Sequence, residues 1–151
     1  MSSQFSGGFA SRMRGVNLIE LMVVVAVVAV LAAIAIPNFQ RYQQDARRAD
    51  AQAVLVDFTQ RLERNFSVNN SYLRPGGVVQ DLPAAITGYT FQYSAAPNAP
   101  TATSYRVEAR PVNVQANDRC GVLLVDNRGN RTAQVLNADN SLGAVINDCW
   151  R

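Results

Sequence analysis

The stretch VNLIELMVVVAVVAVLAAIAI, from Val16 to Ile36, is the most informative part of this 151-residue chain. Asn17 and Glu20 are its only strongly polar members, and the apolar run that follows them is unbroken to Ile36. A helix needs about 20 apolar residues to cross the hydrocarbon core of a membrane. Arg12 and Arg14 precede the run, and positive charge there keeps the N-terminus in the cytoplasm. We therefore expect one membrane-spanning helix and an exported remainder.

A secretory signal peptide is the main alternative to a retained helix. Such a signal has an apolar region of about 7–15 residues, followed by a cleavage site with small residues. Here the run is longer, and Ile36-Pro37-Asn38 is not a small-residue site. The small residue that suits cleavage, Gly15, lies in front of the run. Cleavage there would leave the hydrophobic helix on the mature protein.

Glu20 is an acidic residue near the start of the expected membrane span. Carboxylates in such segments are costly and usually have a partner. If the chain is cut after Gly15, the new amino terminus at Val16 lies four residues before Glu20, which is one helical turn. The two charges would then pair within one chain or between staggered chains. The alternative is a glutamate that simply reaches the membrane interface.

The residues Arg14-Gly15, Val16 to Leu21 and the apolar run that ends at Pro37 resemble the leader and N-terminal helix of type IVa prepilins. The resemblance implies cleavage after Gly15 by the prepilin peptidase, and methylation of the Val16 amino group by the same enzyme. It also implies that Glu20 matches this terminus on a neighbouring subunit during assembly. The family usually has Phe where this chain has Val16. The expected organisation is a leader (1–15), a transmembrane and polymerisation segment (16–37) and a globular pilin head (38–151).

An amphipathic helix is expected to continue from Asn38 to about Phe66, after a kink at Pro37, which lacks an N–H group. Apolar residues recur there at spacings of three and four, which indicates packing against the head. One stripe comprises Phe39, Tyr42, Ala46, Ala49, Ala53 and Val56, and the adjoining one Leu55, Phe58, Leu62 and Phe66. The solvated side is expected to carry Arg41, Arg47, Arg48, Asp50, Arg61 and Arg64.

The head is expected to be a small antiparallel sheet of three or four strands that covers this helix, which makes the fold class α+β. Alternating segments predict strands at 89–95, 105–112, 121–126 and 131–135, and the chain after them is expected to have little regular structure.

Cys120 and Cys149 are the two cysteines of the chain, and histidine is absent. A structural zinc site wants four nitrogen or sulfur ligands, so zinc is not expected. In an exported domain the pair would form a disulfide, worth about 3–4 kcal/mol in the chain-entropy model. Two free thiols in a cytosolic protein are the alternative. The disulfide-bounded C-terminal region of type IV pilins supports the first interpretation.

No constellation in the sequence points to catalysis. A nucleophile elbow and a phosphate-binding glycine loop are both missing, so we expect no enzyme, no cofactor and no small-molecule substrate. Four residues suggest calcium, but their spacing fits no calcium loop and we expect no metal; they are Asp118, Asp126, Asn127 and Asn130. Arg119, Arg128 and Arg131 near one hairpin offer contacts to DNA phosphates, although a solvated turn is the favoured interpretation.

The resemblance implies a structural subunit of a type IV pilus, most similar to a minor pilin that primes assembly or enters the fibre. Its partners would be major and minor pilins, the prepilin peptidase and the inner-membrane assembly machinery. Before assembly it would span the bacterial inner membrane once with its head in the periplasm, and afterwards lie in a cell-surface fibre used for adhesion and twitching motility. A type II secretion pseudopilin and a DNA- or surface-binding pilin are the alternatives.

Overall fold

The computed structural model describes residues 17–150 and divides the chain into two units between Gln40 and Arg41. Helix α1 (Leu18–Asn69) contributes to both units. The head adds five strands and a short 3₁₀ helix, η1 (Asn113–Gln115). The strands are β1 (Tyr89–Tyr93), β2 (Arg106–Pro111), β3 (Val122–Asp126), β4 (Arg131–Leu136) and β5 (Leu142–Ile146). The long helix and the α+β class expected from the sequence are thereby confirmed.

The first unit contains the apolar part of α1. The helix begins after Asn17, whose carbonyl oxygen accepts the N–H of Glu20 at 2.9 Å. Its large hydrophobic side chains are exposed throughout, from Leu18 to Ile36. Pro37 lies inside the helix, which is recorded as continuous on both sides of it. The kink expected there stays a prediction.

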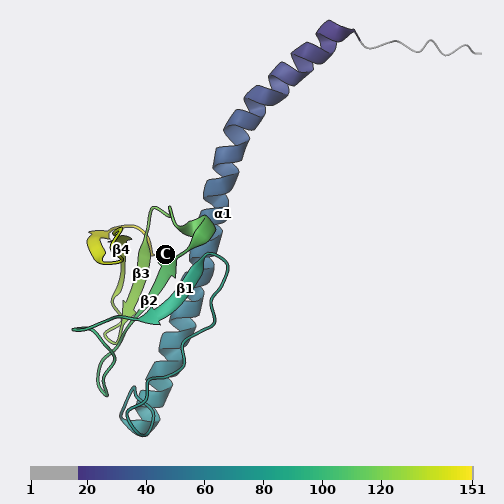
Figure 1. The fold of residues 1–151 in the computed structure, drawn as a ribbon. Helices are drawn as coiled ribbons and strands as arrows, with labels where there is room; N and C mark the ends of the chain where they lie inside the picture. Colours follow the sequence, from purple (N-terminus) through teal and green to yellow (C-terminus); the bar gives the residue numbers. More distant parts are fainter. Residues whose placement is uncertain (1–16, 151) are drawn as a thin grey trace, which may run out of the picture. The chain divides into compact units, whose positions relative to one another are not determined.

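The head is a five-stranded antiparallel sheet in the order β1-β2-β3-β4-β5, packed on the part of α1 that belongs to the same unit (Figure 1). Four of these strands fall where the sequence predicts them. The fifth, β5, replaces an expected irregular tail. Its sequence, LGAVI, contains Gly and Ala, which are weak strand formers, so its pairing with β4 rather than its own propensity places it in the sheet.

The core lies between the sheet and one stripe of α1. Ala51, Leu55, Phe58 and Leu62 are buried against apolar residues of the inner sheet face, among them Val107 and Leu123. Full burial of a side chain of the size of Leu or Phe stabilises by about 1.5–3 kcal/mol. This stripe therefore fixes the helix to the sheet.

The stripe that begins with Phe39 and Tyr42 was also expected to pack in the core, and this prediction is wrong. Tyr42, Ala46, Ala49 and Ala53 are exposed, as is Phe39 in the other unit, and Val56 is half-buried. The sheet covers only one side of the helix, and this stripe lies on the opposite side, so it remains outside. Arg48 is the opposite correction: it was expected on the solvated side, but it is buried, with 7% of its surface exposed.

The predicted disulfide between Cys120 and Cys149 is confirmed, with 5.7 Å between the two Cα atoms. It joins Cys120, which lies two residues before β3, to Cys149 in the segment after β5. The C-terminal residues are thereby attached to the middle of the sheet rather than to its edge.

Candidate functional site

The apolar part of α1 is the first surface of functional interest. Within residues 17–150, α1 is the helix long and apolar enough to cross a membrane, and none of its most apolar window is buried. Exposed fractions reach 73% at Leu18 and 61% at Ile34. An apolar surface of this extent needs lipid or other protein around it.

Glu20 lies in the first turn of this helix and is exposed. It is the one charged residue in the sequence between Leu18 and Gln40. A negative charge is favourable there, because the free N–H groups of the first turn make a helix N-terminus electropositive. Gly15 and Val16 lie outside the described residues, so cleavage and the pairing of Glu20 with the new terminus stay predictions.

The exposed stripe of α1 borders a hollow in the head. This hollow, of about 550 Å³, is lined by residues of α1 together with Arg131 and Trp150. The helix contributes Ala49, Ala53 and Val56 to it, along with Gln52, Asp57 and Gln60. The small side chains leave a shallow apolar surface beside the C-terminal residues.

Asp126 organises the turn between β3 and β4. Its carboxylate accepts the backbone N–H groups of Arg128 and Asn130 at 2.9 and 3.0 Å, and the Asn130 side-chain amide at 2.9 Å. Burial alone would raise the pKa of Asp126, but these hydrogen bonds outweigh it and hold the pKa below its usual range. Its oxygens are thus occupied by the turn. In residues 17–150 no three His, Cys, Asp or Glu residues are grouped to hold a metal ion.

Four arginines surround this turn, and we call them the arginine surface: Arg64, Arg106, Arg128 and Arg131. They border three adjoining hollows of about 450, 280 and 300 Å³. Arg106 faces Asp126 across β2 and β3, and the other three are exposed. No salt bridge is recorded for any of the four within the described part of the chain. The guanidinium groups of Arg64, Arg128 and Arg131 are therefore accessible to an anionic partner.

The structure separates Arg119 from this surface. Arg119 precedes Cys120 at one end of β3, whereas Arg128 and Arg131 follow the other end. Five strand residues at roughly 3.3 Å each place about 17 Å between them. Arg64 and Arg106 take part although no sequence pattern marks them, because they come from α1 and β2 and meet the turn only through the packing of the head.

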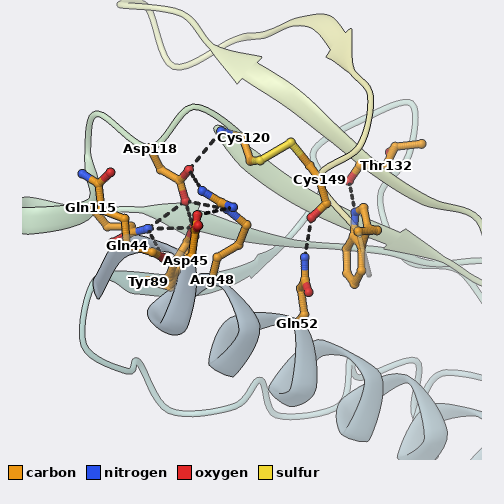
Figure 2. Close-up of a disulfide and its surroundings, with 11 residues drawn as sticks. Gln44, Asp45, Arg48, Gln52, Tyr89, Gln115, Asp118, Cys120, Thr132 and Cys149 are labelled. Atoms are coloured by element: carbon orange, nitrogen blue, oxygen red, sulfur yellow. Dashed lines mark hydrogen bonds and ion pairs between the residues drawn. A yellow bond between two sulfur atoms is a disulfide. The ribbon is translucent and has the colours of Figure 1, made fainter. Parts of the chain in front are cut away.

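A buried polar cluster beside the disulfide was also missed (Figure 2). Arg48 donates to Asp118 from Nε at 3.0 Å and also pairs with it through its terminal nitrogen. Asp118 also accepts hydrogen bonds from the Tyr89 hydroxyl, the Gln115 amide and the backbone N–H of Cys120. The signal was present in the sequence, since Arg48 extends the stripe of Ala51 and Leu55 by one turn. The cluster fastens the loop before β3 to α1, which is an architectural role.

Burial would raise the pKa of Asp118, but its hydrogen bonds hold the pKa below the usual range; the first of them comes from Arg48. The pKa of Tyr89 is raised, first by burial and then by its hydrogen bond to this carboxylate. Asp118 therefore stays ionised beside a protonated tyrosine.

Comparisons with known proteins agree with this geometry. The family described as "Type IV minor pilin ComP, DNA uptake sequence receptor" matches residues 37–124, which are 88 of the 151 residues. A type IV pilin from Shewanella oneidensis, known at high resolution, is similar with 31% sequence identity and a TM-score of 0.50. That match covers 72% of this chain and 98% of the pilin. A search of curated proteins gives no match. The chain therefore belongs to the ComP family of type IV minor pilins, and it is a subunit of a type IV pilus.

Proposed function

We propose that residues 16–37 hold this minor pilin in the bacterial inner membrane, with the head in the periplasm, and later lie in the core of the fibre. The observation that carries this proposal is the continuous exposure of the apolar part of α1. A helix satisfies its own backbone hydrogen bonds, so lipid accepts it, and so does a bundle of like helices. Small residues such as Ala26 and Ala29 permit close helix approach.

The head contributes a second apolar strip for the same purpose. Its exposed residues Tyr42, Ala46, Ala49 and Ala53 have no use inside the subunit, since the sheet packs on the opposite stripe. Contact with major and minor pilins would bury them. A head-to-tail contact that does not close into a ring builds an open helical fibre, which is how one such surface supports either priming or incorporation.

The proposed maturation uses Gly15, Val16 and Glu20. Prepilin peptidase would cut after Gly15 and methylate Val16, and Glu20 would pair with the amino terminus of a neighbouring pilin. Gly15→Leu should leave the precursor at full length, because the peptidase is expected to accept only a small residue immediately before the cleaved bond. A mature-size product from this variant, seen by intact-mass measurement of membranes, would contradict the assigned cleavage site.

The pairing role of Glu20 needs a separate test. Glu20→Ala should reach the membrane at the wild-type level but enter fibres at least about tenfold less, the change expected from losing a charge pair worth about 1.4 kcal/mol. Glu20→Asp is the matched control, since it keeps the charge and should retain most of the assembly. Equal incorporation of Glu20→Ala and wild type, by quantitative immunoblot of sheared fibres, would remove the pairing role.

DNA binding by the head is the second candidate function. The matched family is described as a DNA uptake sequence receptor, and the arginine surface supplies the chemistry that phosphates require. Three of its members, Arg64, Arg128 and Arg131, are exposed and surround hollows that expose backbone and side-chain polar groups. Contact with a DNA backbone at this turn would therefore neutralise several phosphates at once.

The salt dependence of binding tests this surface. The slope of log K against log salt is negative, and each lost phosphate contact should make it shallower by about 0.9 on duplex DNA. Arg64→Ala, Arg128→Ala and Arg131→Ala are each expected to show this change. Arg61→Ala is the matched control, because Arg61 lies on the same helix but is paired with Asp57 at 3.3 Å. Duplex binding with an unchanged slope in all three variants would place the DNA elsewhere, and no binding by the wild type would end the candidate function.

A further inference from the structure

Residues 147–150 follow β5, and Trp150 among them reaches β4; we call these four residues the strap. Their attachment includes contacts that do not involve sulfur. The Gln52 side-chain amide of α1 donates to the carbonyl oxygen of Cys149 at 2.6 Å. The Trp150 indole N–H donates to the carbonyl oxygen of Thr132 in β4 at 2.8 Å. The Arg131 guanidinium lies over the Trp150 ring, 5.9 Å from its centroid.

The other side of the disulfide is held by the same helix. Asp118 accepts the backbone N–H of Cys120 at 3.0 Å, and Arg48 of α1 holds Asp118 (Figure 2). Arg48 and Gln52 are four residues apart, which is about one helical turn. One face of α1 thus holds Cys120 through Asp118 and Cys149 through its carbonyl oxygen.

Burial agrees with a strap that packs as part of the head. Cys149 has 7% of its surface exposed and Cys120 none, and Trp150 packs against the core cluster. The indole also has a polar partner for its N–H group, so its burial leaves no unsatisfied donor.

We propose that the strap docks on α1 and β4 without the disulfide, and that the Cys120–Cys149 bond closes a contact which Gln52 and Trp150 have already made. The disulfide then stabilises the C-terminal surface of the subunit but does not shape it. A subunit whose thiols are reduced presents the same surface, including the placement of Arg131 beside Trp150.

Trp150 is the single tryptophan of the chain, so its fluorescence reports directly on the strap. The test uses the full chain in detergent, with both cysteines replaced by Cys120→Ser and Cys149→Ser. Its acrylamide quenching and emission maximum should stay near those of the wild type. Adding Gln52→Ala should raise the undocked fraction about fivefold, as the loss of one hydrogen bond predicts. Gln40→Ala, the same change about three turns earlier along α1, is the control and should leave the quenching unchanged, because Gln40 does not line the hollow beside Trp150.

Quenching of the cysteine-free chain as strong as in urea, with its far-ultraviolet circular dichroism intact, would overturn the proposal. If removing both cysteines abolishes the folded spectrum, the test moves to chains with the disulfide intact. In these chains dithiothreitol should reduce the disulfide of Gln52→Ala about fivefold faster than that of Gln40→Ala, because an undocked strap exposes the sulfur atoms. Equal reduction rates would overturn the proposal as well.

Discussion

At the scale of single residues, the pair of Arg48 and Asp118 is the most unusual feature of the head. Their side chains are 8% and 0% exposed, respectively. A buried ion pair adds little net stability over apolar residues of the same shape, but the loss of one partner leaves an uncompensated charge. The hydrogen bonds from Tyr89 and Gln115 complete the shell around the carboxylate. Each of the two residues is therefore tolerated in the core only while the other is present.

Asp118→Ala should lower the free energy of unfolding by about 3 kcal/mol, because it leaves the Arg48 guanidinium buried without its carboxylate. The double variant Arg48→Met/Asp118→Leu should lose less than this single change. Urea unfolding of the full chain in detergent, followed by Trp150 fluorescence, measures both. Asp57→Ala is the control: it breaks the exposed pair with Arg61 and should cost less than about 1 kcal/mol. A double variant less stable than Asp118→Ala would contradict the interdependence.

The depressed pKa of Asp118 predicts a pH dependence. A carboxylate whose pKa is lower in the folded state stabilises fully above its unfolded pKa of about 3.9, and this contribution is lost as the pH falls further. The gap in unfolding free energy between wild type and Asp118→Asn should thus be constant from about pH 7 to 5 and narrow below about pH 4. Asp126 and Asp139 also have lowered pKa values, but both proteins contain them, so they cancel. A gap that is the same at pH 3 and pH 7 would contradict the prediction.

At the scale of elements, the join between the disulfide and β3 depends on Gly121. Its φ of +54° lies in the left-handed region, and a Cβ added there would lie 2.3 Å from the carbonyl oxygen of Gln134 in β4. Gly129, in the β3–β4 turn, has a φ of +78° but open space around it. Substitution of Gly129 therefore introduces backbone strain alone, whereas substitution of Gly121 introduces the same strain together with a steric clash.

Gly121→Ala should destabilise the head by about 3 kcal/mol or more, since the strands β3 and β4 would have to move apart. Gly129→Ala should cost only about 1–2 kcal/mol, the strain of a left-handed alanine. Thermal unfolding by circular dichroism compares the two. Equal losses would show that the contact with Gln134 has no importance of its own.

The sequence was sufficient for elements with strong periodicity or composition. The helix was predictable because its apolar run and its stripes extend over many turns, and β1 to β4 because their residues alternate between turn signals. It was not sufficient for β5, whose Gly143 and Ala144 carry no strand signal, nor for the choice between two apolar stripes that lie on opposite sides of α1. That choice depends on which side of the helix the sheet covers.

At the scale of the whole molecule, one helix serves two purposes. Its apolar N-terminal part needs lipid or other pilins around it, and the buried stripe of its later part forms the core of the head. The cleavage and pairing roles of Gly15, Val16 and Glu20 stay predictions, which rest on a small residue, a charge and an apolar run at fixed spacing.

The arginine surface was not readable from the sequence, because Arg64 and Arg106 reach the β3–β4 turn through tertiary packing. Arg119 was wrongly expected beside Arg128 and Arg131 for the same reason, since the packing of the head places it at the other end of β3.

Intact-mass spectrometry of fibres sheared from cells, quantified against the most abundant pilin, tests whether this chain is a pilus subunit. We expect this chain to be present in the fibres as a minor component. Its mass should correspond to residues 16–151 with one added methyl group and the Cys120–Cys149 disulfide. A chain that is processed in the membrane yet absent from the fibres would contradict its role as a pilus subunit.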